Sequence, residues 1–352
     1  MVIFWLAFLV SLALVVEQQS NGIELIKIEN KESKIVFMNY GARIVSWKIG
    51  DNNIVLGNEV EADEFYPHNP FYFGATVGRF GGRIAKGQFE LNGQTYQLEQ
   101  NDGDNHLHGG LQGLSNRLFD YEIIESETEE SAQVYFTTTV KQDEDHYPGN
   151  IDIKVVFTYD ASKTWTVEYF AESDADTLFN PMNHVYFNLN RDNKVVDNHV
   201  IASEKLQMFP LDASGMPVLE PVDLAAIMGS HEIELATLFN TGDVHIQQQV
   251  TTRGGLDHPF EVKDGKMTIS NRDLVLHVET DAPQIVMYTL NDSEDWKSRM
   301  NIFKPHSGIT IETQSIPNDI NLLGTSAHSV LKAHTPFYSK TSYHVELKPR
   351  NA

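Results

Sequence analysis

The sequence of 352 residues contains no cysteine. This absence excludes disulfide bonds, thiolate metal sites and cysteine nucleophiles. Basic residues are also scarce, with 26 Lys and Arg against 49 Asp and Glu, so the formal net charge is −23. A field of that sign repels phosphate backbones and anionic lipid surfaces. We therefore expect neither a nucleic acid nor a membrane as a functional partner.

Motifs for nucleophilic and cofactor chemistry are absent as well. No G-x-S-x-G motif marks an activated serine, and no dinucleotide fingerprint is found. The glycine-rich stretch "GATVGRFGGRIAKG" at 74–87 is followed by no helical pattern whose N-terminus would receive a phosphate. The sequence thus predicts a protein that needs no cofactor.

Residues 1–16 form an apolar segment that turns polar abruptly at Glu17. The segment is short for a membrane span, no Lys or Arg precedes its apolar run, and no clean small-x-small cleavage site follows. Three interpretations stay open: an export signal or anchor, a structural apolar segment, or an extension that is not native, which we favour. Residues 17–352 are predicted to form a single domain, because no linker or repeat divides them. We expect a cytoplasmic location, or an exported or anchored protein if the segment is a real signal.

Short segments with alternating apolar and polar residues recur along the chain, as in "IDIKVVFTYD" and "QIVMYTLN". Alternation with a period of two is typical of strands that bury one face. Asn92-Gly93 predicts a tight hairpin, since both central positions of a type I′ turn need positive φ, and Asp264-Gly265 repeats this signal. The best helix candidate, at 221–239, is interrupted by Gly229. We predict a nearly all-β fold, a sandwich or a barrel with many hairpins.

Two glycine-rich stretches carry side chains suited to binding. Arg79 and Arg83 lie among the glycines of 74–87, where a simpler interpretation is that they pair with surface acids. His106 and His108 share a face if they lie on a strand, and an H-x-H pair can bind a metal. Since nothing nearby supplies a clear third ligand, no metal site is expected.

The stretch "NPMNHVYFNLN" at 180–190 has two contrasting faces. One side carries hydrogen-bonding groups, among them His184 and Tyr186, and a merely solvated face would more usually carry Lys, Glu, Thr or Ser. The other side is apolar and is predicted to face the core: Val185, Phe187 and Leu189.

The stretch "SGITIETQSIPNDIN" places a carboxylate in the middle of a predicted strand. Glu312 shares a face with Thr310 and Gln314, while Ile309, Ile311 and Thr313 share the other face. A carboxylate in that position is either paired, for example with Arg83, or catalytic. A histidine and a glutamate on polar strand faces have the composition of a general acid–base pair. The residues alone therefore indicate a cofactor-free proton-transfer enzyme or a binding face for a polar ligand.

Five motifs in this order resemble those of the aldose 1-epimerases, or galactose mutarotases: "GATVGRFGGRIAKGQFELNGQTYQL", "NHLHGG", "NHVYFNL", "DHPF" and "SGITIETQSIPNDIN". The resemblance spans about residues 22–347. It implies a large antiparallel β-sandwich of the galactose mutarotase type, with a concave sheet that holds the sugar. It also implies an isomerase that interconverts the α and β anomers of free aldohexoses such as galactose and glucose.

The resemblance also implies roles for individual residues. His184 would donate a proton to the ring oxygen of the pyranose, and Glu312 would accept the proton of the anomeric hydroxyl. The other implied substrate contacts are Arg83, His108, Tyr186 and Asp257.

Two positions depart from the pattern of many relatives. Gly82 stands where many have Asn, and Val286 stands where many have Gln, so the preferred sugar is left open. The alternatives are a non-catalytic sugar-binding relative, and a mutarotase acting on phosphorylated sugars or on disaccharides such as maltose. We expect a small sugar as the substrate, and a monomer or homodimer.

Overall fold

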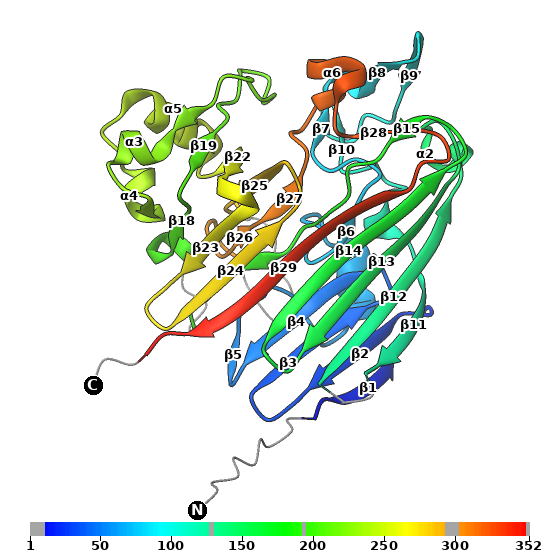
Figure 1. Ribbon diagram of the computed structural model, residues 1–352, viewed down its shortest axis with the longest axis vertical. Coiled ribbons are helices and arrows are strands. Elements are labelled where there is room, and N and C mark those ends of the chain that lie inside the picture. The colour runs from blue at the N-terminus through cyan, green and yellow to red at the C-terminus, as the bar shows by residue number, and fades with distance from the viewer. Residues whose placement is uncertain (1–10, 127–129, 192–194, 293–302, 350–352) are drawn as a thin grey trace, which may run out of the picture.

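The computed structural model describes residues 11–126, 130–191, 195–292 and 303–349. Within these ranges, three larger antiparallel sheets and several two-stranded ladders make up most of the regular structure (Figure 1). The all-β sandwich predicted from the sequence is confirmed.

Two of the sheets face each other across the main core. The N-terminal sheet contains β1 (Ala13–Gln18), β2 (Glu24–Glu29), β3 (Ser33–Met38), β4 (Arg43–Ile49) and β5 (Asn52–Asn53). The nine-stranded sheet runs in the order β11 (Asp120–Glu125), β12 (Ser131–Val140), β13 (Ile151–Asp160), β14 (Thr164–Ser173), β29 (Phe337–Leu347), β24 (Leu274–Thr280), β23 (Lys266–Ser270), β18 (Val200–Ala202) and β21 (Glu232–Glu234).

Aromatic side chains join these two sheets. The rings of Phe37 on β3 and Phe157 on β13 lie 5.0 Å apart, and Trp47 on β4 meets Trp165 on β14 edge-on at 6.3 Å. Such pairs add packing energy to the burial of large apolar surfaces. The sandwich is therefore closed by contacts between strands far apart in the sequence.

Strand β1 crosses the boundary that the sequence predicted after residue 16. It pairs with β2 along its whole length, from Ala13 opposite Glu29 to Gln18 opposite Glu24. Its side chains bury little surface, since Val15 is 53% and Val16 38% exposed. Backbone hydrogen bonds and the packing of Leu14 against the main core thus hold this edge strand, and the sheet begins inside the apolar segment.

A third sheet and several short ladders position the candidate site. The sheet runs β20 (Val222–Asp223), β19 (Leu206–Met208), β22 (Asp257–Val262), β25 (Gln284–Tyr288) and β27 (Glu312–Gln314). The ladders pair β6 (Thr76–Val77) with β16 (Met182–Asn183), β7 (Arg83–Ile84) with β10 (His106–Leu107), β17 (Tyr186–Phe187) with β26 (Ile309–Thr310), β8 (Gln88–Leu91) with β9 (Gln94–Gln97), and β15 (Thr177–Leu178) with β28 (Val330–Leu331).

The helices are short. They are α1 (Ala62–Phe65), α2 (Gln142–Asp145), α3 (Leu224–Met228), α4 (Leu235–Phe239), α5 (Val244–Arg253) and α6 (Asp319–Leu323), with 3₁₀ turns at Tyr66–His68, Ala85–Gly87, Leu114–Asn116, Val196–Asn198, Lys263–Gly265 and Gly324–Ser326. Figure 1 shows α3, α4 and α5 gathered at one end of the molecule. None of the helices in the described part of the chain has the length and apolarity needed to span a bilayer.

The helix predicted at 221–239 is two helices. Gly229 ends α3 with a positive φ of 69°, and β21 separates α3 from α4. Since β21 pairs with β18, the chain gains an edge strand of the nine-stranded sheet at the point where the helix breaks.

The two predicted hairpins have different outcomes. Asn92 and Gly93 have φ of 54° and 75° and connect the paired strands β8 and β9, as predicted. The prediction of a hairpin at Asp264-Gly265 is wrong. The strands on either side of this turn do not pair, because β22 belongs to the third sheet and β23 to the nine-stranded sheet. This turn instead connects the two sheets. It packs closely against Thr280, since a Cβ atom at Gly265 would lie 1.9 Å from the carbonyl oxygen of Thr280.

Candidate active site

A cavity of about 230 Å³ brings all the predicted site residues together. The predicted residues that line it come from five separate parts of the chain. They are Gly82, Arg83, His108, His184, Tyr186, Asp257 and Glu312.

The stretch at 180–190 folds as its alternation predicts. Its apolar side chains, Val185, Phe187 and Leu189, belong to the main core. The opposite side chains, His184 and Tyr186, line the cavity and are themselves buried. Core packing on one side of this segment therefore fixes where the imidazole lies on the other.

Glu312 lies on β27 at the wall of the cavity and is 3% exposed. Its Oε1 accepts a hydrogen bond from Thr310 Oγ1 (2.9 Å), and its Oε2 accepts one from Gln314 Nε2 (3.3 Å). Val286 stands directly opposite on β25 and adds apolar surface beside the carboxyl group. Burial raises the pKa of Glu312 to about 8 despite the bond from Thr310.

The imidazole of His184 lies next to this carboxyl group, with 3.3 Å between His184 Nε2 and Glu312 Oε1. Burial lowers the pKa of His184 to about 3. The other ring nitrogen, Nδ1, is buried without a hydrogen-bond partner among the described residues, so an imidazolium would leave an N–H donor unpaired there. Both shifts favour a protonated Glu312 and a neutral His184 in the free protein. The pair therefore shares one transferable proton near neutral pH.

His108 is fixed by its backbone neighbour Gly82. The Gly82 N–H donates to His108 Nδ1 (3.1 Å), and the His108 N–H donates to the Gly82 carbonyl (3.1 Å). Burial lowers the pKa of His108 well below 6.5, so the ring is neutral. Because Nδ1 accepts a hydrogen bond, the proton of the neutral ring is on Nε2, which is therefore a donor.

Gly82 has no room for a side chain in this structure. Its φ is +79°, and a Cβ atom there would lie 2.8 Å from the ring of Pro317. Pro317 thus occupies the space that a larger residue at position 82 would need.

Arg83 anchors the opposite wall of the cavity. Its Nε donates to Asp102 Oδ2 (2.6 Å), and its Nη1 lies 3.6 Å from Asp257 Oδ2. Burial raises the pKa of Asp257, while the Arg83 guanidinium opposes that rise. No ion pair joins Arg83 to Glu312, so the pairing suggested for that carboxylate is not with this arginine.

Sequence reasoning missed several residues that line the cavity: Tyr72, Asp102 and Tyr288. Tyr72 has a φ of 55°, and nothing in its sequence neighbourhood marks it as a site residue. Gln314 also lines the cavity, and its place on the same strand face as Glu312 is the signal that finds it. No sequence signal identifies Tyr72 and Tyr288, which only the fold brings to the cavity.

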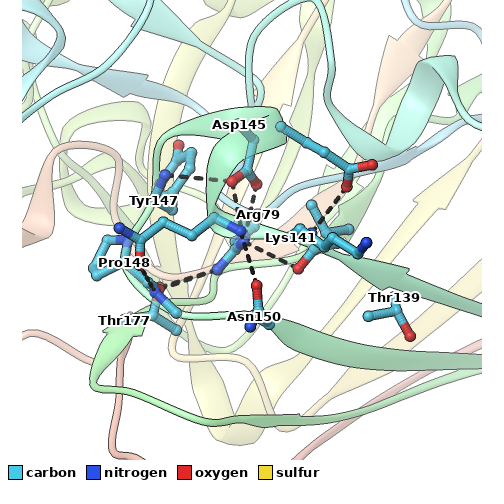
Figure 2. Close-up of polar contacts among 12 residues, drawn as sticks. Arg79, Thr139, Lys141, Asp145, Tyr147, Pro148, Asn150 and Thr177 are labelled. Carbon is cyan, nitrogen blue, oxygen red and sulfur yellow. Dashed lines mark hydrogen bonds and ion pairs between the residues drawn. The ribbon is translucent and has the colours of Figure 1, made fainter.

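Arg79 lies outside the cavity and does not pair with surface acids. It is buried, and its Nε and Nη2 donate to Asp145 Oδ2 (2.7 Å) and Oδ1 (3.0 Å) (Figure 2). Its Nη1 also donates to the Pro148 carbonyl (3.2 Å) and to Thr177 Oγ1 (3.3 Å). Arg79 therefore anchors the segment that leads to Gly82 and Arg83.

His106 also lies outside the cavity, although its neighbour His108 lines it. Its Nδ1 is 2.7 Å from the Glu99 carbonyl oxygen, and burial lowers its pKa. The φ of 54° at His108 turns the backbone after β10, so the two imidazoles do not share a face. The described residues contain no group of three or more metal-ligating side chains.

The cavity of this β-sandwich is polar and holds a buried carboxyl group in contact with a buried imidazole. Such a site is typical of proteins that bind polar small molecules and can catalyse proton transfer. The family model for aldose 1-epimerase matches residues 24–344. The chain therefore belongs to the aldose 1-epimerase family, and it is an isomerase.

Individual relatives agree with this placement. The chain is 31% identical to the aldose 1-epimerase of Haemophilus influenzae over 85% of this chain and 88% of that protein. It is 27% identical to the maltose epimerase of Levilactobacillus brevis over 88% of this chain and 91% of that protein. The crystal structure of galactose 1-epimerase from Lactobacillus acidophilus superposes with a TM-score of 0.83 and 26% identity, covering 97% of this chain and 100% of that one.

Proposed function

We propose that this protein interconverts the α and β anomers of free aldohexoses, with galactose and glucose as substrates. The observation that carries the proposal is the contact of 3.3 Å between His184 Nε2 and Glu312 Oε1 inside the cavity. An acid and a base held together can move both protons that ring opening requires, which is typically worth about 10²–10⁴-fold in rate.

The reaction opens and recloses a cyclic hemiacetal. In our proposal Glu312 takes the proton of the C1 hydroxyl while His184 gives a proton to the ring oxygen, so the C1–O5 bond breaks and an aldehyde forms. Rotation about C1–C2 then presents the other face of the aldehyde. Reclosure reverses both transfers, and the enzyme returns to its starting protonation state.

This sequence begins with an ionised Glu312 and a protonated His184, whereas burial in the free protein favours the neutral forms of both. The two forms contain the same number of protons and differ by one transfer across the contact. A bound sugar favours the charged form, because its C1 hydroxyl donates to a carboxylate and its ring oxygen accepts from an imidazolium. Substrate binding thus prepares the pair for the reaction.

The rest of the cavity supplies groups that suit sugar hydroxyls. We propose that Arg83, Asp257, Tyr186 and the Nε2–H of His108 contact them, and that Gly82 contributes only its backbone. The volume of about 230 Å³ is below the roughly 300–1,000 Å³ of pockets for drug-sized ligands, which supports one sugar ring over two. The relative named maltose epimerase keeps a disaccharide as the second candidate.

Polarimetry on freshly dissolved α-D-galactose, α-D-glucose, xylose and maltose tests the proposal. The protein is expected to speed the decay of optical rotation for the hexoses most, and His184→Asn and Glu312→Gln are expected to lose about 10²–10⁴-fold. Tyr135→Phe, on β12 of the nine-stranded sheet and outside the cavity lining, serves as a control that keeps the wild-type rate. A near-wild-type rate in Glu312→Gln would refute the assignment of Glu312 as the proton acceptor. Sugar binding without any rate would identify a non-catalytic relative, and a maltose rate above the hexose rates would identify a disaccharide enzyme.

The expected cytoplasmic location and the monomeric or homodimeric state stay predictions.

A further inference from the structure

The imidazole of His184 lacks the hydrogen bond that usually orients a catalytic histidine. In such sites the ring nitrogen that does not react is normally bonded to a carboxylate or a carbonyl, which sets the tautomer and the ring orientation. Nδ1 of His184 is buried and has no such partner on any other residue in the described part of the chain. The neighbouring His108 differs, since the Gly82 N–H fixes its Nδ1. Apart from the contact of its Nε2 with Glu312, the His184 ring must therefore be held by packing.

Three rings surround this imidazole. The ring centroids of Tyr72, His108 and Tyr186 lie 5.7, 5.2 and 5.0 Å from that of His184. Tyr72 also meets His108 edge-on at 4.7 Å. Tyr72 thus contacts both His184 and His108 from a separate segment of the chain. Aromatic rings therefore pack around the His184 imidazole, and Tyr72 is one of them.

The backbone ties Tyr72 to His184 as well. The Ala75 N–H donates to the Tyr72 carbonyl (2.9 Å), which closes a tight turn in which Tyr72 has a φ of 55°. The last two residues of this turn are bonded to the backbone of His184: the His184 N–H donates to the Ala75 carbonyl, and the His184 carbonyl accepts from the Gly74 N–H, each at 2.8 Å. The turn therefore moves with His184 and holds the tyrosine ring at a set place against it.

A buried arginine fixes the same turn from behind. Arg43 Nη1 donates to the Phe73 carbonyl (2.8 Å), and Nη2 donates to the Ser115 carbonyl (2.7 Å). A Cβ atom at Gly74 would lie 1.8 Å from the Ile44 carbonyl oxygen, so the turn packs directly against the backbone of β4 in the N-terminal sheet. Tyr72 is consequently held by covalent geometry, three backbone hydrogen bonds and a buried side chain.

We propose that Tyr72 is a positioning residue for the reaction: its ring fixes the orientation of the His184 imidazole by packing, in place of a hydrogen bond at Nδ1, and keeps water away from that nitrogen. The inference rests on the proposed function, because it assigns Tyr72 a role through the proton donor of that reaction. The ring rather than the phenol hydroxyl carries the role. Removing the hydroxyl should therefore change kcat little, and removing the ring should lower kcat strongly.

Kinetics of two substitutions separate ring from hydroxyl. Tyr72→Phe keeps the ring, and we expect its kcat to stay within about threefold of wild type. Tyr72→Leu removes the ring, and we expect kcat to fall about 10²-fold with a much smaller change in KM, as for a misplaced catalytic group. If the leucine variant does not fold, Tyr72→Met provides a second variant whose side chain has no aromatic ring. Tyr135→Leu, the same change on the remote strand β12, should leave both constants unchanged.

A spectroscopic measurement on the sugar-free protein tests the packing directly. The imidazole ¹⁵N signals of His184, assigned by their loss in His184→Gln, report which nitrogen carries the proton. We expect one tautomer in the wild type and in Tyr72→Phe, and a mixture of both in Tyr72→Leu or Tyr72→Met. A single unchanged tautomer in the variants without the ring overturns the inference, as does a kcat loss in Tyr72→Phe equal to that in Tyr72→Leu. If the wild type has no mutarotase activity, the proposed function fails, whereas the tautomer result still decides whether Tyr72 orients His184.

Discussion

Replacing Glu312 by Gln should make the protein more stable while it removes the activity. Gln has nearly the same volume as Glu, and its amide oxygen can still accept the hydrogen bond that Thr310 Oγ1 gives at 2.9 Å. The substitution removes the ability of the buried carboxyl group to ionise, and it places an amide nitrogen where Oε2 accepts the longer bond of 3.3 Å from Gln314 Nε2. Sites built for chemistry often carry such a stability cost.

The size of the effect follows from the pKa of Glu312, which burial raises from 4.5 to about 8. Above pH 4.5 the unfolded chain releases this proton, whereas the folded chain keeps it until about pH 8. The unfolded state then binds fewer protons, so stability falls as the pH rises across this window. At about 1.4 kcal/mol for each pH unit, the cost at pH 7 is on the order of 3 kcal/mol. We expect Glu312→Gln to gain that amount at pH 7 and almost nothing at pH 4.5.

Urea unfolding of wild type and Glu312→Gln at several pH values between 4.5 and 8 measures this difference. Glu261→Gln provides the matched control, because Glu261 lies on the exposed side of β22, pairs with Lys205 and is 41% exposed as a side chain. It should show no comparable gain, since exposed pairs contribute little. A pH dependence of stability that is the same in wild type and Glu312→Gln would refute the reasoning.

Three further predictions concern the same framework. The active pair needs its one shared proton, so kcat/KM for mutarotation should fall near pH 8, where Glu312 ionises, and an alkaline limb near the 6.5 of an ordinary histidine would contradict this. Arg79→Leu should lower the free energy of unfolding in urea by about 3–5 kcal/mol, because it leaves Asp145 buried and unpaired. Arg79→Leu combined with Asp145→Leu should recover most of that loss, and a double variant as unstable as the single one would argue against a charge effect. Gly82→Asn should reduce thermal stability and activity, because its Cβ would meet the Cβ and Cγ atoms of Pro317 at 2.8 Å, and Gly82→Ala, which brings the same Cβ without the amide, should lose both as well if the clash is the cause.

The sequence alone identifies the strand faces of the candidate site correctly. Alternation places Val185, Phe187 and Leu189 in the core, since a strand sends successive side chains to opposite faces. The same rule puts His184 and Tyr186 on the cavity side, and the motifs that resemble aldose 1-epimerases select the same histidine. Local pattern suffices here because burial on one face decides the register of the whole segment.

Other features could not be predicted from local pattern. Asp264-Gly265 carries a hairpin signal, but the partner strands are chosen by distant segments, so the turn joins two sheets instead. Arg79 looks like a surface residue, and only the fold brings Asp145 to it. Tyr72 reaches the two histidines through a turn whose place depends on Arg43 and on the backbone of His184.

The sequence by itself determined the fold class, the family and the residues that the chemistry needs, because side-chain alternation and motif order are properties of the chain. The tertiary structure decided the protonation of those residues. Glu312 and His184 are more than 120 residues apart in the sequence, and their pKa values depend on burial and on each other's distance. Desolvation and contact exist only once the sheets have packed, so the reactive state of the pair is a property of the folded molecule.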